Sequence, residues 1–202
     1  MPAKDPLERS KRKRAAEGEK PKKKRRSSSS SDEEDPNAKI LLMEQGILES
    51  RKNYNDIAIL LSTMGEYETG NPESMLAAVA LCRVFVRLLA QGALIPKKSM
   101  SEKDAVVVAW LKEQFSAFKA TLMSFLEDED LAMTALTLCM RVLTAEGEYM
   151  HSGDDYSFPS AFLQSIVSTV LEGDDEDVRR AYIEEYAEQY DDIRYYTFKS
   201  VK

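Results

Sequence analysis

The sequence predicts an all-α fold, namely an irregular antiparallel α-solenoid of HEAT- or armadillo-like helix pairs, preceded by a disordered N-terminal tail. Apolar residues recur at helical spacing from residue 38 to the C-terminus. The apolar–polar alternation that is typical of half-buried strands is absent. Glycines and N-cap residues stand between the apolar segments, where helices end and begin. A compact helical bundle is the alternative arrangement of the same helices.

The first part of the chain predicts three helices, at 38–50, 53–64 and 72–91. Gly65 and Gly92 follow the second and third of these segments, as glycines do at helix C-termini. Asn71 precedes the third segment and is expected to cap it, with Pro72 at the first helical position. The third helix is apolar over a wide face, so we expect it to be buried on two sides.

The second part predicts five more helices, which are 101–126, 131–146, 159–172, 175–189 and 191–201. Gly147 and Gly173 are expected to end the segments before them. In the 175–189 helix, the inward residues are expected to be Val178, Tyr182, Ile183 and Tyr186.

Short turns join these helices into three pairs, which begin at residues 53, 101 and 159. The resulting spacings of 48 and 58 residues exceed the ~40–47 of HEAT or armadillo units, so the repeat is expected to be irregular.

Composition narrows the class of function. The chain has 202 residues, 43% of them hydrophobic, and lacks both a run of about 18 apolar residues and an apolar secretory leader. One histidine and two cysteines are too few for a zinc site, which needs about four ligands. A phosphate-binding glycine loop and a nucleophile elbow are also missing. The sequence therefore predicts that the protein is not an enzyme and that it needs no cofactor or metal ion. We also expect it to bind neither a membrane nor a small-molecule substrate.

Individual reactive residues fit the same interpretation. His151 lies in a polar loop without a nucleophile nearby in sequence, so we expect a solvated side chain rather than a catalytic base. Cys82, Cys139 and Trp110 lie in apolar helical patterns and are expected to be core residues. The acidic clusters at 127–130, 174–177 and 191–192 lack a 12-residue calcium loop and are expected to be charges at helix starts.

Residues 1–36 form the predicted disordered tail, and residues 37–202 form the predicted helical-repeat domain. Five of the first 36 residues are apolar, which is too little buried surface to offset the entropy of ordering the segment. Residues 1–26 carry a net charge of +8, whereas residues 37–202 carry −11. A body of that charge is a poor surface for nucleic acid and suits a basic protein partner.

Two basic clusters in the tail predict a bipartite nuclear import signal, to be bound by a nuclear import receptor. Ten residues separate the clusters, which are Lys11, Arg12 and Lys23, Lys24, Arg25, Arg26. At this separation both clusters can lie along one groove, where their stems stack on aromatic rings and their cationic heads meet carboxylates. The alternatives are a solubilising tail and weak, nonspecific contact with rRNA phosphates, which depends strongly on salt.

A serine run follows the basic clusters. Ser29, Ser30 and Ser31 each have an acidic residue three positions later, as acid-directed kinases require. Each phosphate would add about −1.5 to −2 charges next to the basic clusters. We expect these serines to be phosphorylation sites, and a low-complexity spacer is the alternative.

The C-terminal segment is unusually rich in aromatic and charged residues. Between residues 186 and 198 it contains five aromatic side chains, paired acids and an arginine. Its interface candidates are Tyr190, Asp191, Asp192, Arg194, Tyr195 and Tyr196, because Tyr and Arg are enriched in binding hot spots. Packing of aromatic rings between terminal helices is the alternative.

The stretch Tyr190–Thr197 resembles the YDDxRYxT signature of the nucleolar complex protein 4 family. Other stretches agree in order: Asn55–Leu60, Leu81–Phe85, and Phe158–Pro159 ahead of the signature. The resemblance covers residues 38–201.

It implies a helical-repeat protein of the nucleus and nucleolus that pairs with a larger nucleolar protein. It also implies action in the small-subunit processome during 18S rRNA maturation. Members of the family continue into a CCAAT-binding-factor-type domain, and this sequence ends at Lys202 before it. A truncated product, a fragment and an incomplete gene model are the alternatives, and we assign no residue to partner binding through that domain.

The predicted function is thus a non-catalytic assembly factor in ribosome biogenesis that docks other proteins. A nuclear RNA- or DNA-binding module that uses the basic N-terminal arm is the alternative.

Overall fold

The computed structural model describes residues 35–69, 71–97, 99–150 and 158–201. The chain divides into two units, Met1–Glu33 and Glu34–Lys202, and the second unit contains the described helices. The basic clusters, the three serines and His151 lie outside the described residues. Within the described ranges, every regular element is a helix, and no helix combines the length and apolar character needed to cross a membrane.

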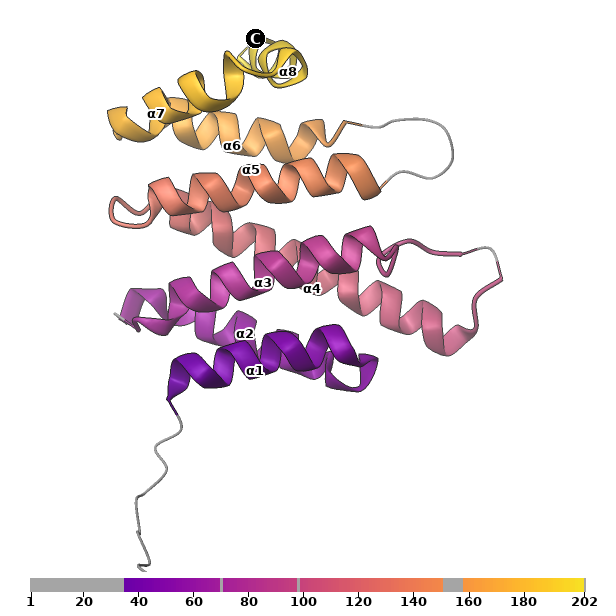
Figure 1. Cartoon of the computed structure of the whole chain (residues 1–202). Helices are drawn as coiled ribbons and strands as arrows, with labels where there is room; N and C mark the ends of the chain where they lie inside the picture. The colour runs from indigo at the N-terminus through magenta and orange to yellow at the C-terminus, as the bar shows by residue number, and fades with distance from the viewer. Residues whose placement is uncertain (1–34, 70, 98, 151–157, 202) are drawn as a thin grey trace, which may run out of the picture. The chain divides into compact units, whose positions relative to one another are not determined.

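In the part of the chain that the structure describes, eight α-helices follow one another (Figure 1). They are α1 (Pro36–Glu49), α2 (Asn55–Gly65), α3 (Glu73–Ala90), α4 (Glu102–Leu126), α5 (Ala132–Tyr149), α6 (Ser160–Glu172), α7 (Glu176–Tyr182) and α8 (Asp191–Ser200). Short 3₁₀ turns lie at Arg51–Asn53 and Glu66–Thr69, and a π-helical turn at Ile183–Ala187 follows α7.

The helices stack in two layers. In one layer α1 packs on α3, α3 on α5 and α5 on α7, while in the other α2 packs on α4, α4 on α6 and α6 on α8. Consecutive helices join the layers, and Figure 1 shows the stack rising in chain order. The predicted pairs are α2–α3, α4–α5 and α6–α7, which begin at Asn55, Glu102 and Ser160, so their spacings are 47 and 58 residues. The predicted irregular α-solenoid is therefore confirmed.

Local capping explains where several helices begin and end. The Asn71 side chain accepts a hydrogen bond from the Glu73 amide at 2.9 Å, as predicted. Ser101 Oγ accepts from the Asp104 amide at 3.2 Å, and Asp175 Oδ1 accepts from the first-turn amides of α7. Gly92 has φ +66°, the left-handed conformation that favours glycine just beyond a helix.

Two sequence-based boundaries were wrong. Helix α5 continues through the buried Gly147 to Tyr149, because burial of this helix outweighs the roughly 1 kcal/mol that an internal glycine costs. Helix α7 ends at Tyr182 rather than at residue 189, and the Glu188 amide then donates to the Ile183 carbonyl at 2.9 Å, which closes the π turn. The turn leaves Ile183 40% exposed, although the helical period predicted an inward side chain.

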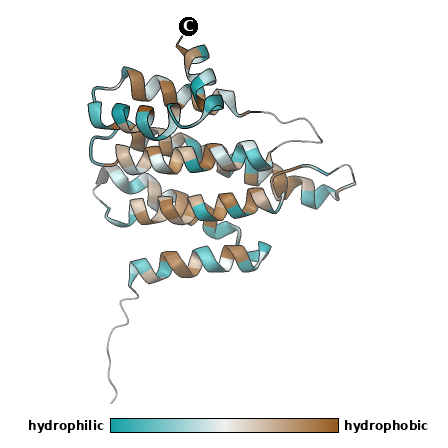
Figure 2. Ribbon diagram, turned by 45° about the horizontal axis from the view of Figure 1, so that its top comes forward, coloured by the Kyte–Doolittle hydropathy of each residue, from teal (hydrophilic) through white to brown (hydrophobic). Residues whose placement is uncertain are grey.

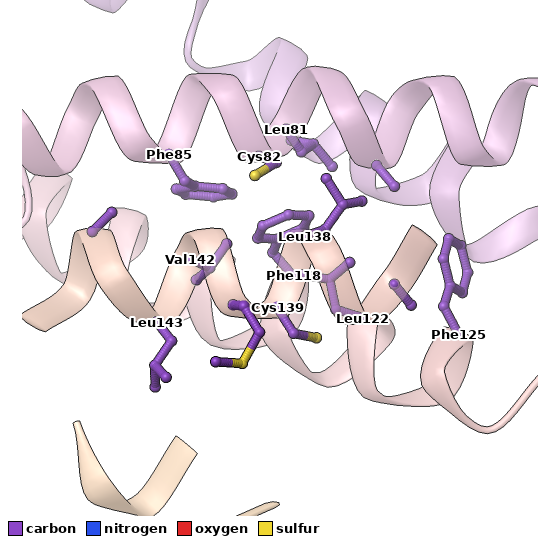
Figure 3. Packing of buried hydrophobic residues seen from close by; sticks show 14 of the residues in the cluster. Leu81, Cys82, Phe85, Phe118, Leu122, Phe125, Leu138, Cys139, Val142 and Leu143 are labelled. Atoms are coloured by element: carbon purple, nitrogen blue, oxygen red, sulfur yellow. The ribbon is translucent and has the colours of Figure 1, made fainter. Parts of the chain in front are cut away.

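The core lies between α3, α4 and α5. Figure 3 shows Phe85 and Cys82 of α3 above Phe118 of α4 and Cys139 of α5. The ring centroids of Phe85 and Phe118 are 5.2 Å apart in a stacked arrangement. Figure 2 shows hydrophobic residues along these helices and hydrophilic residues at helix ends and turns.

Both cysteines are buried in this core, and Trp110 is partly buried against it. Burial raises the pKa of Cys82 to about 11 and that of Cys139 to about 12, so both thiols stay protonated at neutral pH. They behave as the small core residues that the sequence predicts.

Partly buried ion pairs connect the helices around the core. Arg83 of α3 donates to both carboxylate oxygens of Glu44 on α1, at 2.7 and 2.5 Å. Lys119 of α4 donates to Glu146 of α5 at 2.8 and 3.0 Å, and its ammonium also lies 4.8 Å from the ring centroids of Phe115 and Phe162. Lys119 therefore links three consecutive helices, α4, α5 and α6.

Replacement of Lys119 by alanine is expected to lower the free energy of unfolding by about 1–3 kcal/mol. The substitution leaves the Glu146 carboxylate, whose side chain is only 17% exposed, without its cationic partner. Urea denaturation followed by circular dichroism measures the effect. Lys103→Ala, at an exposed position of the same helix, is the matched control and should change stability by less than about 0.5 kcal/mol. Equal effects of the two substitutions would show that the Lys119 cluster contributes nothing specific.

Candidate protein interface around the last helix

The last helix begins at the segment that the sequence singled out. Tyr190 occupies the N-cap position of α8, and Asp191 and Asp192 lie in its first turn, where negative charge interacts favourably with the helix dipole. Asp191 forms an ion pair with Arg194 one turn later. The Asp192 carboxylate accepts a hydrogen bond from the Ile193 amide at 2.8 Å.

One face of α8 points into the stack. Ile193 is buried, and the Tyr196 ring lies parallel to the Phe158 ring with centroids 4.1 Å apart. Thr197 Oγ1 lies 2.6 Å from the hydroxyl of Tyr182, a fully buried residue on α7. Burial raises the pKa of the Tyr182 hydroxyl, so this group stays neutral and able to donate. These contacts fix α8 against α6 and α7.

The opposite face carries large apolar side chains exposed to solvent. Tyr195, Phe198 and Val201 are 62%, 67% and 61% exposed, and Tyr190 just before them is 56% exposed. We call these four residues the terminal face. The Tyr195 ring meets the Tyr196 ring edge-on at 5.1 Å, so the exposed aromatic residue rests on a packed one. Contiguous exposed apolar surface of this kind marks interaction sites in soluble proteins.

A groove of about 610 Å³ adjoins this segment. Tyr186, Tyr190 and Ile193 line it from the α7–α8 side, Phe158 and Pro159 from the start of α6, and residues of α5 complete it. Arg141, Glu148 and Asp192 place one positive and two negative charges at the groove. The groove can therefore accept a mainly apolar segment that brings a few polar groups.

The structure divides the six sequence-derived interface candidates into four groups. Tyr190 and Asp192 line the groove, and Tyr195 lies on the terminal face. Asp191 and Arg194 pair with each other on the surface, whereas Tyr196 is partly buried against the core. Phe198 and Val201 also belong to the terminal face. Phe198 follows Tyr195 by three residues and Val201 follows Phe198 by three, and this spacing was the signal that could have found them.

Two acidic turns adjoin each other elsewhere in the stack. Residues 127–130 and 174–177 line one hollow of about 970 Å³. Asp128 and Asp175 accept hydrogen bonds from backbone amides at the adjoining helix starts, which is the role that the sequence predicts. Among the residues that the structure describes, no three His, Cys, Asp or Glu side chains come together to hold a metal ion.

Tyr195 and Tyr196 are adjacent tyrosines with opposite environments, so they give a matched test of this assignment. Tyr196→Ala is expected to lower the free energy of unfolding by about 1–3 kcal/mol, because it removes a stacked ring that fastens α8 to the segment before α6. Tyr195→Ala is expected to change stability by less than about 0.5 kcal/mol. Denaturant titration of both variants measures their free energies of unfolding. A larger decrease for Tyr195→Ala than for Tyr196→Ala would reverse the assignment of the two faces.

Comparison with known proteins agrees with this architecture. A family described as nucleolar complex protein 4-like, TPR repeats, matches residues 28–202. An uncharacterized protein from Schizosaccharomyces pombe is 29% identical over 166 residues, which are 79% of this chain and 34% of that protein. The chain thus spans about a third of the length of this curated relative.

The family match runs through all the described helices and confirms the resemblance seen in the sequence. The family is one of nucleolar ribosome biogenesis factors. The chain belongs to the nucleolar complex protein 4-like family.

Proposed function

We propose that the protein is a non-catalytic nucleolar scaffold in small ribosomal subunit biogenesis, where it acts in 18S rRNA maturation within the small-subunit processome. The observation that carries the proposal is the match of residues 28–202 to a nucleolar family, on a helical stack that ends in an exposed aromatic face. Helical stacks of this kind bind other proteins along extended surfaces.

The chemistry of the described side chains supports a scaffold rather than an enzyme. The partly buried charged groups pair across helices, as in Arg83–Glu44 and Lys119–Glu146, and these pairs serve packing. The raised pKa values of Cys82 and Cys139 keep both thiols protonated, and a protonated thiol is a poor nucleophile.

Protein partners of the nucleolar complex are proposed to dock around α8. Tyr190, Tyr195 and Arg194 belong to the residue types that dominate binding hot spots, and Asp191 and Asp192 add charge at the rim. Tyr196 supports Tyr195 from below through their ring contact. Burial of these rings by a partner would remove apolar surface from water, which is favourable.

Residues 1–36 are proposed to form a separate tail that directs the protein to the nucleus and nucleolus. In this proposal a nuclear import receptor binds Lys11, Arg12 and the cluster at 23–26. Phosphorylation of Ser29, Ser30 and Ser31 would place negative charge beside that cluster and weaken the contact. Phosphopeptide mass spectrometry of the protein from cells tests the modification, and serines found only unmodified would remove it.

Replacement of the cluster Lys23–Arg26 by four alanines is expected to abolish nuclear accumulation. The substitution removes the longer of the two basic clusters that the receptor would bind. Fluorescence imaging measures the nuclear-to-cytoplasmic ratio of a fusion that is too large to diffuse through the nuclear pore. The matched control removes the same number of charges from exposed positions of the folded part, at Lys52, Arg87, Lys97 and Lys103, and should leave the ratio unchanged. Nuclear accumulation of the tail variant would contradict the import proposal.

A nuclear RNA- or DNA-binding module is the second candidate function, favoured by the net charge of +8 on residues 1–26. Affinity purification from cells separates the two. We expect a chain that starts at Asn37, targeted to the nucleus by an unrelated import signal, to recover small-subunit rRNA precursors as well as the full chain does. Loss of the precursors together with the arm, and salt-sensitive RNA binding by the full chain alone, would favour the second candidate.

A further inference from the structure

We propose that Ser101 is the phosphorylation site of an acid-directed protein kinase and that Arg51 and Lys97 hold its phosphate. The proposal goes beyond the docking function proposed above and does not depend on it. Three observations carry it, namely the sequence around the serine, the conformation of the backbone there, and the cations of the adjoining hollow.

The sequence around Ser101 fits a kinase of this class. Glu102 is the first residue after the serine and Asp104 is the third, which is also where the acids follow the serine run of the tail. In the described part of the chain, other hydroxyl residues also have an acid three positions later, and they are Thr63, Ser99, Ser124 and Thr169. The sequence pattern alone therefore leaves five candidates.

The backbone conformation separates Ser101 from the three helical candidates. Thr63, Ser124 and Thr169 lie inside α2, α4 and α6, so a kinase that accepts an extended segment must unfold a helical turn to reach them. Ser101 precedes the first turn of α4 in an extended conformation, with φ −69° and ψ 156°, and is exposed. For its two acids to extend, the first turn of α4 alone has to open, and helix ends open most readily.

Charge separates Ser101 from Ser99, which is exposed just before it. Lys97 and Lys98 directly precede Ser99 in the sequence. An acid-directed kinase recognises its substrate through basic pockets, and these pockets repel cations next to the serine. Two further residues separate Ser101 from the same lysines, and one cation, Lys103, stands between its two acids.

The hydroxyl group of Ser101 already belongs to a polar network that ends on a cation. It donates to Oδ2 of Asp104 at 2.8 Å and accepts from the Asp104 amide at 3.2 Å. Oδ1 of the same carboxylate accepts a hydrogen bond at 3.2 Å from Arg51, which lies in the turn between α1 and α2. Arg51, Lys97 and Asp104 line one hollow of about 280 Å³. The Arg51 side chain is 70% exposed, so it is free to follow a new anion.

Phosphorylation would exchange the partner of Arg51. Oγ of Ser101 attacks the γ-phosphorus of the ATP that the kinase holds, and the bond from that phosphorus to the oxygen shared with the β-phosphate breaks. ADP leaves with the electron pair of that bond, and the hydroxyl proton passes to the catalytic base of the kinase. The modified side chain can no longer donate to Asp104, and its phosphate repels that carboxylate. Arg51 then pairs with the phosphate instead.

The charges around the site favour this exchange. Arg51 and Lys97 of the hollow and Lys103 of the first turn supply three positive charges, against two negative charges from Glu102 and Asp104. The phosphate would add about −1.5 to −2 charges at the N-terminus of α4, where the helix dipole and the unpaired amides of the first turn stabilise an anion. A phosphate held in this way would fasten the turn before α2 to the start of α4.

Phosphorylation in vitro tests which residue is modified. The full chain with Ser29, Ser30 and Ser31 replaced by alanine is incubated with a purified acid-directed kinase and ATP, and phosphopeptide mass spectrometry measures the occupancy of each hydroxyl group. Ser101 is expected to carry at least about tenfold more phosphate than any of the four other candidates of the folded part, because the helical ones require local unfolding. Equal or greater occupancy at one of those four would overturn the assignment.

Two substitutions that break the same ion pair separate recognition by the kinase from local structure. Asp104→Asn removes an acid that the kinase reads and is expected to slow phosphorylation of Ser101 at least about fivefold, because a charge-assisted contact is lost. Arg51→Ala breaks the same ion pair and keeps the acid, so it should leave the rate within about twofold, since an exposed ion pair contributes little. Equal slowing by both substitutions would contradict acid-directed recognition and overturn the proposal.

Phosphorus NMR of the phosphorylated chain tests whether the two cations hold the phosphate. Neighbouring cations favour the dianion, so replacement of both Arg51 and Lys97 by alanine is expected to raise the second pKa of the phosphate by about half a pH unit or more. Replacement of Lys39 and Lys199, two exposed lysines of α1 and α8, is the matched control and should leave this pKa unchanged. The same pKa in both double variants would overturn the phosphate site. Phosphopeptide mass spectrometry of the chain from cells is expected to find modified Ser101, and Ser101 found only unmodified would overturn the modification itself.

Discussion

The whole stack depends on burial of α3 and α5 on two sides at once. Each of these helices has ten buried residues among its 18, whereas α1 buries Ile40 and Ile47 and α8 buries Ile193 alone. Burial of apolar surface is the dominant favourable contribution to folding. Among the described helices, the apolar burial that holds them together is therefore concentrated in α3 and α5.

Ion pairs between helices fix how the helices are aligned, whereas the apolar core stabilises the stack. Arg83–Glu44 joins α1 to α3, and Lys119–Glu146 joins α4 to α5 beside Phe162 of α6. A partly buried ion pair contributes little net stability, but loss of one partner leaves a charge poorly solvated and is costly. Such pairs penalise any sliding of one helix along the next. An apolar stripe without them would tolerate several registers, so the ion pairs select one arrangement of a stack that the apolar core stabilises.

Helix positions could be predicted from sequence because their determinants are local, whereas the errors came from determinants that are not. Asn71 and Gly92 act on amides or carbonyls within a turn of themselves, and each begins or ends a helix where it was expected. Gly147 failed as a stop signal because tertiary burial held α5 helical beyond it. The π turn at Ile183 inserts one residue into the helical period. No residue in the hydrophobic pattern of the sequence predicts this insertion.

The same limit applies to the candidate site. The high density of aromatic residues pointed to residues 186–198. It could not show that Tyr195 is exposed whereas Tyr196 is packed against the core. Adjacent residues on a helix point about 100° apart, and which of them is covered depends on Phe158, which lies 38 residues earlier in the chain than Tyr196. Composition could locate the segment, and only the packing of α6 against α8 could assign its faces.

Residues 1–26 carry a net charge of +8, whereas residues 37–202 carry −11. Import signals must be cationic to meet the carboxylates of their receptor, and a cationic face on the folded body would compete for the same receptor and bind RNA nonspecifically. The net charge of −11 on residues 37–202 avoids both effects. It also means that a docking surface on this body selects partners by apolar complementarity first and by their positive charge second. The exposed rings of α8 beside a row of carboxylates have that composition, and they lie on a helix whose own burial contributes least to the stack. Tyr195 and Phe198 are exposed on α8, so their replacement would remove little of the buried apolar surface that stabilises the core.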